Sequence, residues 1–137
     1  MSVLARTSTE RLEAYWSSLE AKPKIRLLRK PETGLVMIRA RAGGDGMRFH
    51  LGEMTVTRCA AAAGDVVGHA WVAGRDHRRA ELAAIFDAML QQPERHEQVM
   101  RGLIDPEAAR QSEARRAREA KAAATRVEFY TMVRGDE

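Results

Sequence analysis

The sequence predicts an α+β fold, and three observations support that prediction. Apolar residues recur at helical spacing near the N-terminus and again beyond residue 76. Between them, Gly, Pro and Asp divide residues 25–73 into segments typical of strands and turns. The turns are short, so the strands should pair antiparallel, because parallel pairs need long crossover connections. We therefore expect an N-terminal helix, a four-stranded antiparallel meander, C-terminal helices and a final strand.

The first predicted helix covers residues 7–21. Thr7 and Glu10 have the spacing of a capping box, in which each side chain bonds an amide at the helix start. Pro23 ends the segment, because proline disfavours a helical conformation in the residue before it. Four apolar residues recur with a period of three to four and should share the buried face: Leu12, Tyr15, Trp16 and Leu19.

Turn residues delimit the four predicted strands. Pro31 and Gly34 favour a first turn, glycines in residues 43–46 a second, and Gly64-Asp65 a two-residue hairpin. Gly52 is expected to introduce a bulge into the long third strand. The strands are predicted over residues 25–29, 35–42, 47–63 and 66–73.

The second half returns to helical patterning. Asp76 is a favourable N-cap for a helix with a regular apolar face, and Pro93 begins a further segment. Asp105-Pro106 has the pattern of an N-cap followed by an N1 proline. The helix over residues 106–124 is rich in alanine and charge and has no large apolar side chain, so it has little of its own to bury. Residues 125–134 alternate as the final strand.

Length and charge limit the classes of function. The 137 residues suit a single domain, residues 1–137, and the net charge of +4 is too small to identify a nucleic-acid-binding protein. One cysteine, Cys59, excludes an internal disulfide framework. No apolar run approaches the ~20 residues that cross a bilayer, and the first residues lack a secretory signal pattern. We expect a cytoplasmic protein without membrane association.

Arg58 is the most informative residue of the third predicted strand. By strand alternation it shares a face with Met54 and Val56, so a cation follows two apolar residues. A buried cation needs an anionic or carbonyl partner, and the planar guanidinium group suits phosphate. Arg58 is therefore a candidate phosphate ligand. The alternatives are a bulge that reverses the alternation, or a pair with an internal acid.

A second basic group lies where the last meander strand meets the next helix. Arg75, His77, Arg78 and Arg79 surround Asp76 there. The amides and partial positive charge of a helix start attract anions, so these side chains favour contact with a phosphate or an acidic partner. The equally weighted alternative is a solvated basic turn in which Asp76 only caps the helix.

The sequence contains no recognisable catalytic set. The four histidines, His50, His69, His77 and His96, lack metal-ligand spacing, so no metal site is expected. Cys59 has no base near it in sequence and is interpreted as a packing residue. The glycines of residues 43–46 lack phosphate-loop spacing. The isolated chain is therefore not expected to be a complete enzyme.

The charged helix and the last strand together predict a surface that another subunit completes. Residues 110–121 contain five basic and two acidic residues and no aromatic residue for stacking on bases. A partner-facing or solvated helix is thus favoured over a nucleic-acid-binding one. An uncovered edge strand also presents unpaired amides and carbonyls. The candidate interface residues are Arg115, Arg118, Phe129, Tyr130, Met132 and Arg134.

Several segments resemble the PhnG family. They occur in the expected order and extend from about Val3 to the C-terminus: residues 34–41, the turn 43–46, residues 51–58, residues 74–76 with Ala80-Glu81, and residues 127–136. PhnG is a small subunit of the bacterial carbon–phosphorus lyase system, which degrades phosphonates.

The resemblance implies a function within a complex. The family's core complex contains G, H, I and J subunits. Subunits G, H and I, with a PhnL-type protein, are implicated in transferring the ribose triphosphate of MgATP to an alkylphosphonate. Adenine is released, and when the substrate is methylphosphonate the product is α-D-ribose 1-methylphosphonate 5-triphosphate. This chain would be a subunit of a transferase, not catalytic alone and without a cofactor of its own, while MgATP is a substrate of the complex.

The resemblance also marks individual positions. Gly52, Thr57, Gly74 and Asp76 belong to the family's structural motifs, and no catalytic residue is assigned. Arg58, Arg75 and His77 are the candidate contacts to substrate or phosphate, with the arginines ranked higher because a neutral histidine weakens an anion contact. The alternatives are an assembly subunit without substrate contact and, ranked last, a basic nucleic-acid-binding module.

Overall fold

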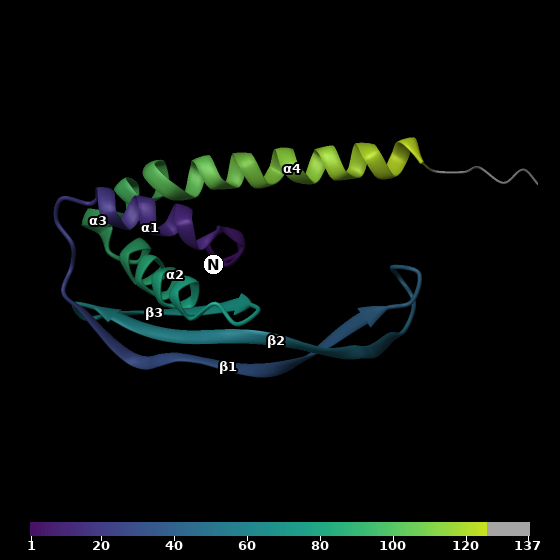
Figure 1. Ribbon diagram of the computed structural model, residues 1–137, viewed down its shortest axis with the longest axis horizontal. Helices are drawn as coiled ribbons and strands as arrows, with labels where there is room; N and C mark the ends of the chain where they lie inside the picture. The colour runs from purple at the N-terminus through teal and green to yellow at the C-terminus, as the bar shows by residue number, and fades with distance from the viewer. Residues whose placement is uncertain (126–137) are drawn as a thin grey trace, which may run out of the picture.

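The computed structural model describes residues 1–125 as a sheet with helices packed on one of its faces (Figure 1). The predicted final strand, with Phe129, Tyr130, Met132 and Arg134, lies outside the described residues. The α+β class is confirmed. The elements are, in chain order, the short 3₁₀ helix η1 (Leu4–Arg6), α1 (Thr9–Ser18), β1 (Ile25–Arg41), β2 (Arg48–Ala63), β3 (Val66–Ala73), α2 (His77–Leu90), α3 (Pro93–Val99), the π-helical segment η2 (Met100–Ile104) and α4 (Asp105–Ala124).

Among residues 1–125 the sheet has three antiparallel strands in the order β1-β2-β3, so the prediction of a four-stranded meander over residues 25–73 was wrong. The segment 31–34, which was predicted as a turn, lies within β1. Lys30 and Pro31 together lie opposite the single β2 residue Cys59, which makes a bulge. Proline, which has no amide hydrogen, is tolerated at a bulge and on an edge strand, and β1 is an edge strand of the sheet that residues 1–125 form.

The other strands follow their predicted bounds closely. β3 has the predicted limits, and β2 begins one residue later than expected. The β1–β2 register shifts where Leu51 is inserted, beside Gly52 with its φ of 151°. The predicted bulge near Gly52 is therefore confirmed, and a positive φ there suits glycine.

The N-terminal helix is shorter than predicted. α1 begins at Thr9 with Ser8 at its N-cap, so the proposed capping box of Thr7 and Glu10 is absent. Thr7 is buried instead, and its hydroxyl donates to the carbonyl of Val3 at 2.9 Å. The predicted apolar face is correct: Leu12 and Leu19 are buried, while Tyr15 and Trp16 pack against the core.

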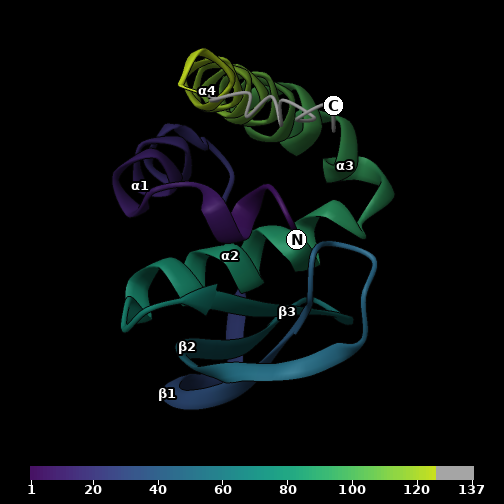
Figure 2. The same ribbon diagram turned by 90° about the vertical axis from the view of Figure 1, so that its right-hand side faces the viewer.

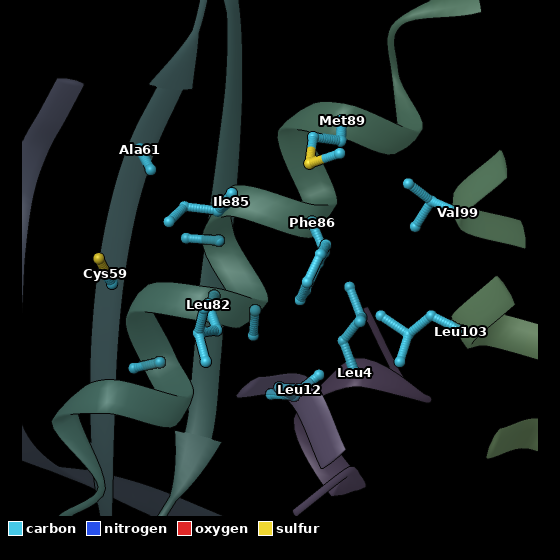
Figure 3. Packing of buried hydrophobic residues seen from close by; sticks show 14 of the residues in the cluster. Leu4, Leu12, Cys59, Ala61, Leu82, Ile85, Phe86, Met89, Val99 and Leu103 are labelled. Carbon is cyan, nitrogen blue, oxygen red and sulfur yellow. The ribbon is translucent and has the colours of Figure 1, made fainter. Parts of the chain in front are cut away.

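α2 packs against the sheet and forms the centre of the core (Figure 3). Phe86 is fully buried, with ring centroids 5.6 Å from Tyr15 and 6.1 Å from Trp16. The sheet offers small side chains to α2, among them Cys59, Ala61 and Ala70. Small residues on the facing strands let the helix backbone lie close to the sheet.

Two elements project from this core in the same direction (Figures 1 and 2). β3 pairs with β2 only as far as Val56, so within residues 1–125 the remainder of the β1–β2 hairpin has no third strand. We call residues 35–55 the β-arm. The second element is α4, whose residues 113–124 are exposed and which continues directly from η2 without a side-chain cap by Asp105. None of the helices in residues 1–125 has both the length and the hydropathy needed to span a membrane.

Candidate functional site

Gly74 and Asp76 hold the β3–α2 junction in place. The Gly74 amide donates to the carbonyl of Thr55 at 2.9 Å, and its φ of 89° favours glycine. Asp76 caps α2 by accepting from the Arg79 amide at 2.9 Å, as predicted, and its other oxygen accepts from the Thr9 hydroxyl at 2.5 Å. Burial alone would raise the pKa of Asp76, but these hydrogen bonds and the Arg79 charge hold it below its ordinary value. The side chain is therefore a carboxylate engaged within the chain.

Thr57 and His77 extend the same hydrogen-bond network. The fully buried Thr57 hydroxyl donates to the Gly74 carbonyl at 2.7 Å and lies 3.3 Å from the Thr33 hydroxyl. Thr33 in turn lies 2.9 Å from Nε2 of His77, the first residue of α2. This chain of contacts joins β1, β2 and α2. The structure thus places His77 in an internal contact rather than directed at an open cavity.

Arg58 lies on the outer face of the sheet. It shares that face with Met54 and Val56, as strand alternation predicts, but the opposite face, with Thr57 and Cys59, packs against α2. The expectation that Arg58 enters an apolar interior is therefore wrong. The alternation correctly grouped the residues but did not show which group faces the core.

Glu32 is the partner of Arg58, so the alternative of an internal acid is correct. Nε of Arg58 lies 2.5 Å from Oε1 of Glu32, and the guanidinium carbon lies 5.6 Å from the centroid of the Trp71 ring. Arg29 also bonds Glu32. Hydrogen bonds from Arg29 first and Arg58 second lower the pKa of Glu32. An open hollow of about 280 Å³ beside this cluster is lined by Gly34, Val36 and neighbouring residues of β1–β3.

The basic first turn of α2 is balanced largely by acids of the same chain. Arg78 lies 2.5 Å from Glu13 and 3.1 Å from Glu81, which explains why a cationic turn is tolerated at a helix start. The Glu13 hydrogen bond raises the pKa of Arg78. Within residues 1–125, Arg75 forms no ion pair, and it does not line the hollow beside Arg58. Arg58 and Arg75 therefore do not converge on one cavity of this chain.

Arg115 and Arg118 line a cleft that sequence reasoning did not foresee. With Arg6 of η1 and Arg110, they surround an open space of about 330 Å³ between η1 and α4. Nε2 of Gln111 fixes α4 to the N-terminal segment by donating to the Val3 carbonyl at 3.0 Å. Arg6 is over a hundred residues away in sequence, so no local pattern associates it with α4.

Cys59 is a buried thiol, which leads to a testable prediction. Burial, and secondly the Glu81 charge, raise the pKa of the Cys59 thiol to about 11. At pH 8 the folded chain should hold about 100-fold less thiolate than the unfolded chain, and thiolate is the reactive form. Reaction with iodoacetamide or a disulfide reagent should therefore be slow in buffer and rapid in urea. Equal rates in both solvents would contradict the burial of this thiol.

The described residues form a small α+β domain with a tightly bonded strand–helix junction, two projecting elements and open, arginine-lined hollows. Residues 1–135 match the family model described as phosphonate metabolism protein PhnG, and the chain belongs to this family. It is 43% identical, over 139 aligned positions, to the α-D-ribose 1-methylphosphonate 5-triphosphate synthase subunit PhnG of Rhizobium meliloti (strain 1021). The match covers 100% of this chain and 88% of that relative.

Proposed function

We propose that this chain is a subunit of an α-D-ribose 1-methylphosphonate 5-triphosphate synthase. The observation that supports this most directly is the 43% identity, across the entire chain, to a synthase subunit of that name. In the proposed reaction the ribose triphosphate of MgATP is transferred to an alkylphosphonate, and adenine leaves. The proposed companions are the H, I and J subunits, together with a PhnL-type protein, in the cytoplasm.

Within that complex we assign the chain an assembly and positioning role. Its candidate polar side chains are largely engaged with other groups of the same chain: Asp76 caps α2, His77 contacts Thr33, and Arg58 is paired with Glu32. A group that transfers protons or attacks substrate needs access to the reacting atoms. The β-arm and α4, by contrast, extend away from the core and have surface available for other subunits.

Arg75 is the best remaining candidate for direct contact with substrate. It is exposed and lies in the loop between Gly74 and Asp76, whose hydrogen bonds fix the backbone on both sides. Arg58 is a weaker candidate, because a new anion would compete with its carboxylate partner Glu32.

Reconstitution with the other subunits tests the assembly proposal and the Arg75 proposal separately. We expect the wild-type chain to co-purify with the H, I and J subunits, and adenine release from MgATP with methylphosphonate to require it. An intact complex that releases adenine equally well without this chain would refute the synthase role.

The Arg75 contact is tested in the assembled complex. Arg75→Ala should leave assembly intact and lower adenine release about 10- to 100-fold, the equivalent of one charge-assisted hydrogen bond. Arg26→Ala is the matched control, because Arg26 is also exposed and lies at the far end of β1. Equal turnover of the two variants would remove Arg75 from the substrate site and leave the assembly role in place.

A further inference from the structure

The β-arm carries an unusual amount of exposed apolar surface. Met47 is 87% exposed, Leu35 63%, Leu51 62% and Met37 59%. In the described part of the chain, the arm beyond the end of β3 is a two-stranded ribbon, and such ribbons are only marginally stable in water when nothing packs on them. Single apolar residues scattered over a protein surface are ordinary, but apolar surface gathered on one projecting element indicates an interaction site.

The outer end of the β-arm concentrates positive charge. Arg41 is paired directly across the ribbon with Arg48, and Arg39 with His50. Like charges opposite each other destabilise a strand pair, so this arrangement favours an external anion that separates them. Arg39, Arg41 and Arg48 form no ion pair within residues 1–125, and with Ala40 they line a hollow of about 250 Å³. The hollow is large enough to receive a carboxylate side chain.

Two of the exposed apolar residues of the β-arm lie on the same face as the arginines of β1. Leu35 and Met37 have the same strand parity as Arg39 and Arg41, so on β1 this face is apolar near the core and basic toward the tip, while Glu53 of β2 lies opposite Met37. Leu35 is paired across the strands with Thr55 of β2, and Thr57 has the same parity on β2. This face of the β-arm therefore continues into the face of the sheet on which α2 packs.

α4 projects on that same side of the sheet (Figures 1 and 2). Its arginines Arg115 and Arg118 line the cleft that faces η1. The two projecting elements therefore both carry positive charge, so they have no electrostatic reason to close on each other. A negatively charged molecule is attracted to both.

A different protein subunit fits this face better than a second copy of this chain or a nucleic acid does. A symmetric dimer joined through the β-arm would bring the same patch, with the same arginines, from both copies together. Binding of a single-stranded nucleic acid relies on several aromatic side chains for stacking, and on the β-arm Phe49 is the sole aromatic residue beside aliphatic leucines and methionines. Flexible methionine side chains adapt well to an apolar protein groove.

We infer that the β-arm docks into a groove of another subunit of the complex, one that is apolar along its length and acidic where it receives Arg39, Arg41 and Arg48. This inference rests on the proposed function, because it takes the partner from the same synthase. Apolar contact supplies the buried surface, while the acidic residues neutralise the opposed arginines and fix the register of docking.

Arg48→Glu separates docking from folding, because the two effects have opposite signs. The substitution puts opposite charges across the ribbon from Arg41, so the isolated chain should melt at the same temperature or slightly higher. Affinity for a purified subcomplex of the remaining synthase subunits should nevertheless fall by about tenfold or more, with most of the change in the association rate and its salt dependence. Arg26→Glu makes the same change of charge outside the β-arm and should leave the affinity unchanged.

The apolar part of the inference has its own variant pair. Met37→Ser should weaken binding to the same subcomplex by about tenfold. Leu28→Ser removes an apolar side chain of β1 that is exposed outside the β-arm, and should have little effect.

Wild-type affinity in both Arg48→Glu and Met37→Ser would overturn the inference while leaving the synthase role intact. If the wild-type chain does not bind the subcomplex at all, the proposed function fails first. Self-association that Arg48→Glu alters would identify a second copy as the occupant and also overturn the inference.

Discussion

Replacement of Gly68 by alanine should be among the most destabilising single changes in this chain. A Cβ atom at this position would lie 2.1 Å from the carbonyl oxygen of Ala84 and 2.3 Å from the amide nitrogen of Ala88. Both are backbone atoms of α2, so no side-chain rotation can relieve the overlap, and the helix must move off the sheet. We expect a loss of about 3 kcal/mol in the free energy of unfolding, the upper part of the range for overpacked cores. Gly68→Val should leave no cooperatively folded chain.

Urea denaturation of the isolated chain measures this loss. Gly34→Ala is the matched control, because Gly34 is also a strand glycine but has no atom within 4 Å of the position of its added Cβ. The control should shift the free energy of unfolding by no more than about 0.5 kcal/mol. If Gly68→Ala unfolds at the same urea concentration as the wild type, α2 does not lie this close to β3.

Local sequence signals predicted the β2–β3–α2 unit well. Gly64-Asp65 marks a tight hairpin, and Asp76 supplies a cap whose side chain must follow the strand directly. The same kind of signal failed at Pro31, because turn-forming residues are also acceptable at a bulge of an edge strand. Whether β1 lies at an edge depends on the arrangement of the whole sheet, which no window of residues around Pro31 contains.

The candidate site shows a similar limit. Alternation correctly placed Arg58 with Met54 and Val56, but the side of the sheet that receives α2 is decided by packing. The partner of Arg58, Glu32, lies on a strand that was interpreted as a turn, so the pair could not be foreseen. Exposure of the β-arm was hidden for another reason: Leu35 and Met37 look like core residues, but in the described part of the chain no helix covers the sheet where they lie.

Glu107 is the most buried charged residue among the described residues, at 2% exposure, and it fixes the first turn of α4. Its two oxygens bond Arg11 of α1 and Arg110 of α4, the latter at 2.7 Å. Beyond this turn, residues 113–124 of α4 are exposed. The position of α4 therefore depends strongly on Glu107, together with the contact of Gln111 to Val3.

Glu107→Gln should lower the free energy of unfolding by roughly 2 kcal/mol. Removing one member of a fully buried ion pair costs about 3–5 kcal/mol. We expect a smaller loss here because Arg11 and Arg110 are 50% and 44% exposed, so water can solvate their guanidinium groups once the carboxylate is gone. Amides of α4 should also exchange with solvent faster, since the helix loses its anchor to α1. Urea denaturation and hydrogen exchange measure the two effects.

Acid conditions should reduce this difference between variant and wild type. Burial alone would raise the pKa of Glu107, but hydrogen bonds from Arg110 and Arg11 hold it below its ordinary value. The unfolded chain therefore binds the proton more readily, so the contribution of Glu107 is complete above its unfolded pKa, about 4.3, and is lost as the pH falls through the folded pKa. The wild type should thus lose more stability than Glu107→Gln between about pH 5 and pH 3.

Glu119→Gln provides the control for both measurements on the same helix. Glu119 is exposed and lies 3.8 Å from Arg115, and such surface pairs contribute at most about 1 kcal/mol and often nothing measurable. Its unfolding free energy should follow that of the wild type at every pH. If Glu107→Gln also follows the wild type, α4 is held by its direct continuation from η2 and by the contact of Gln111 to Val3, and the buried carboxylate does not anchor the helix. A parallel loss in both variants would instead indicate that the total charge of α4 matters and the Arg11–Glu107–Arg110 cluster does not.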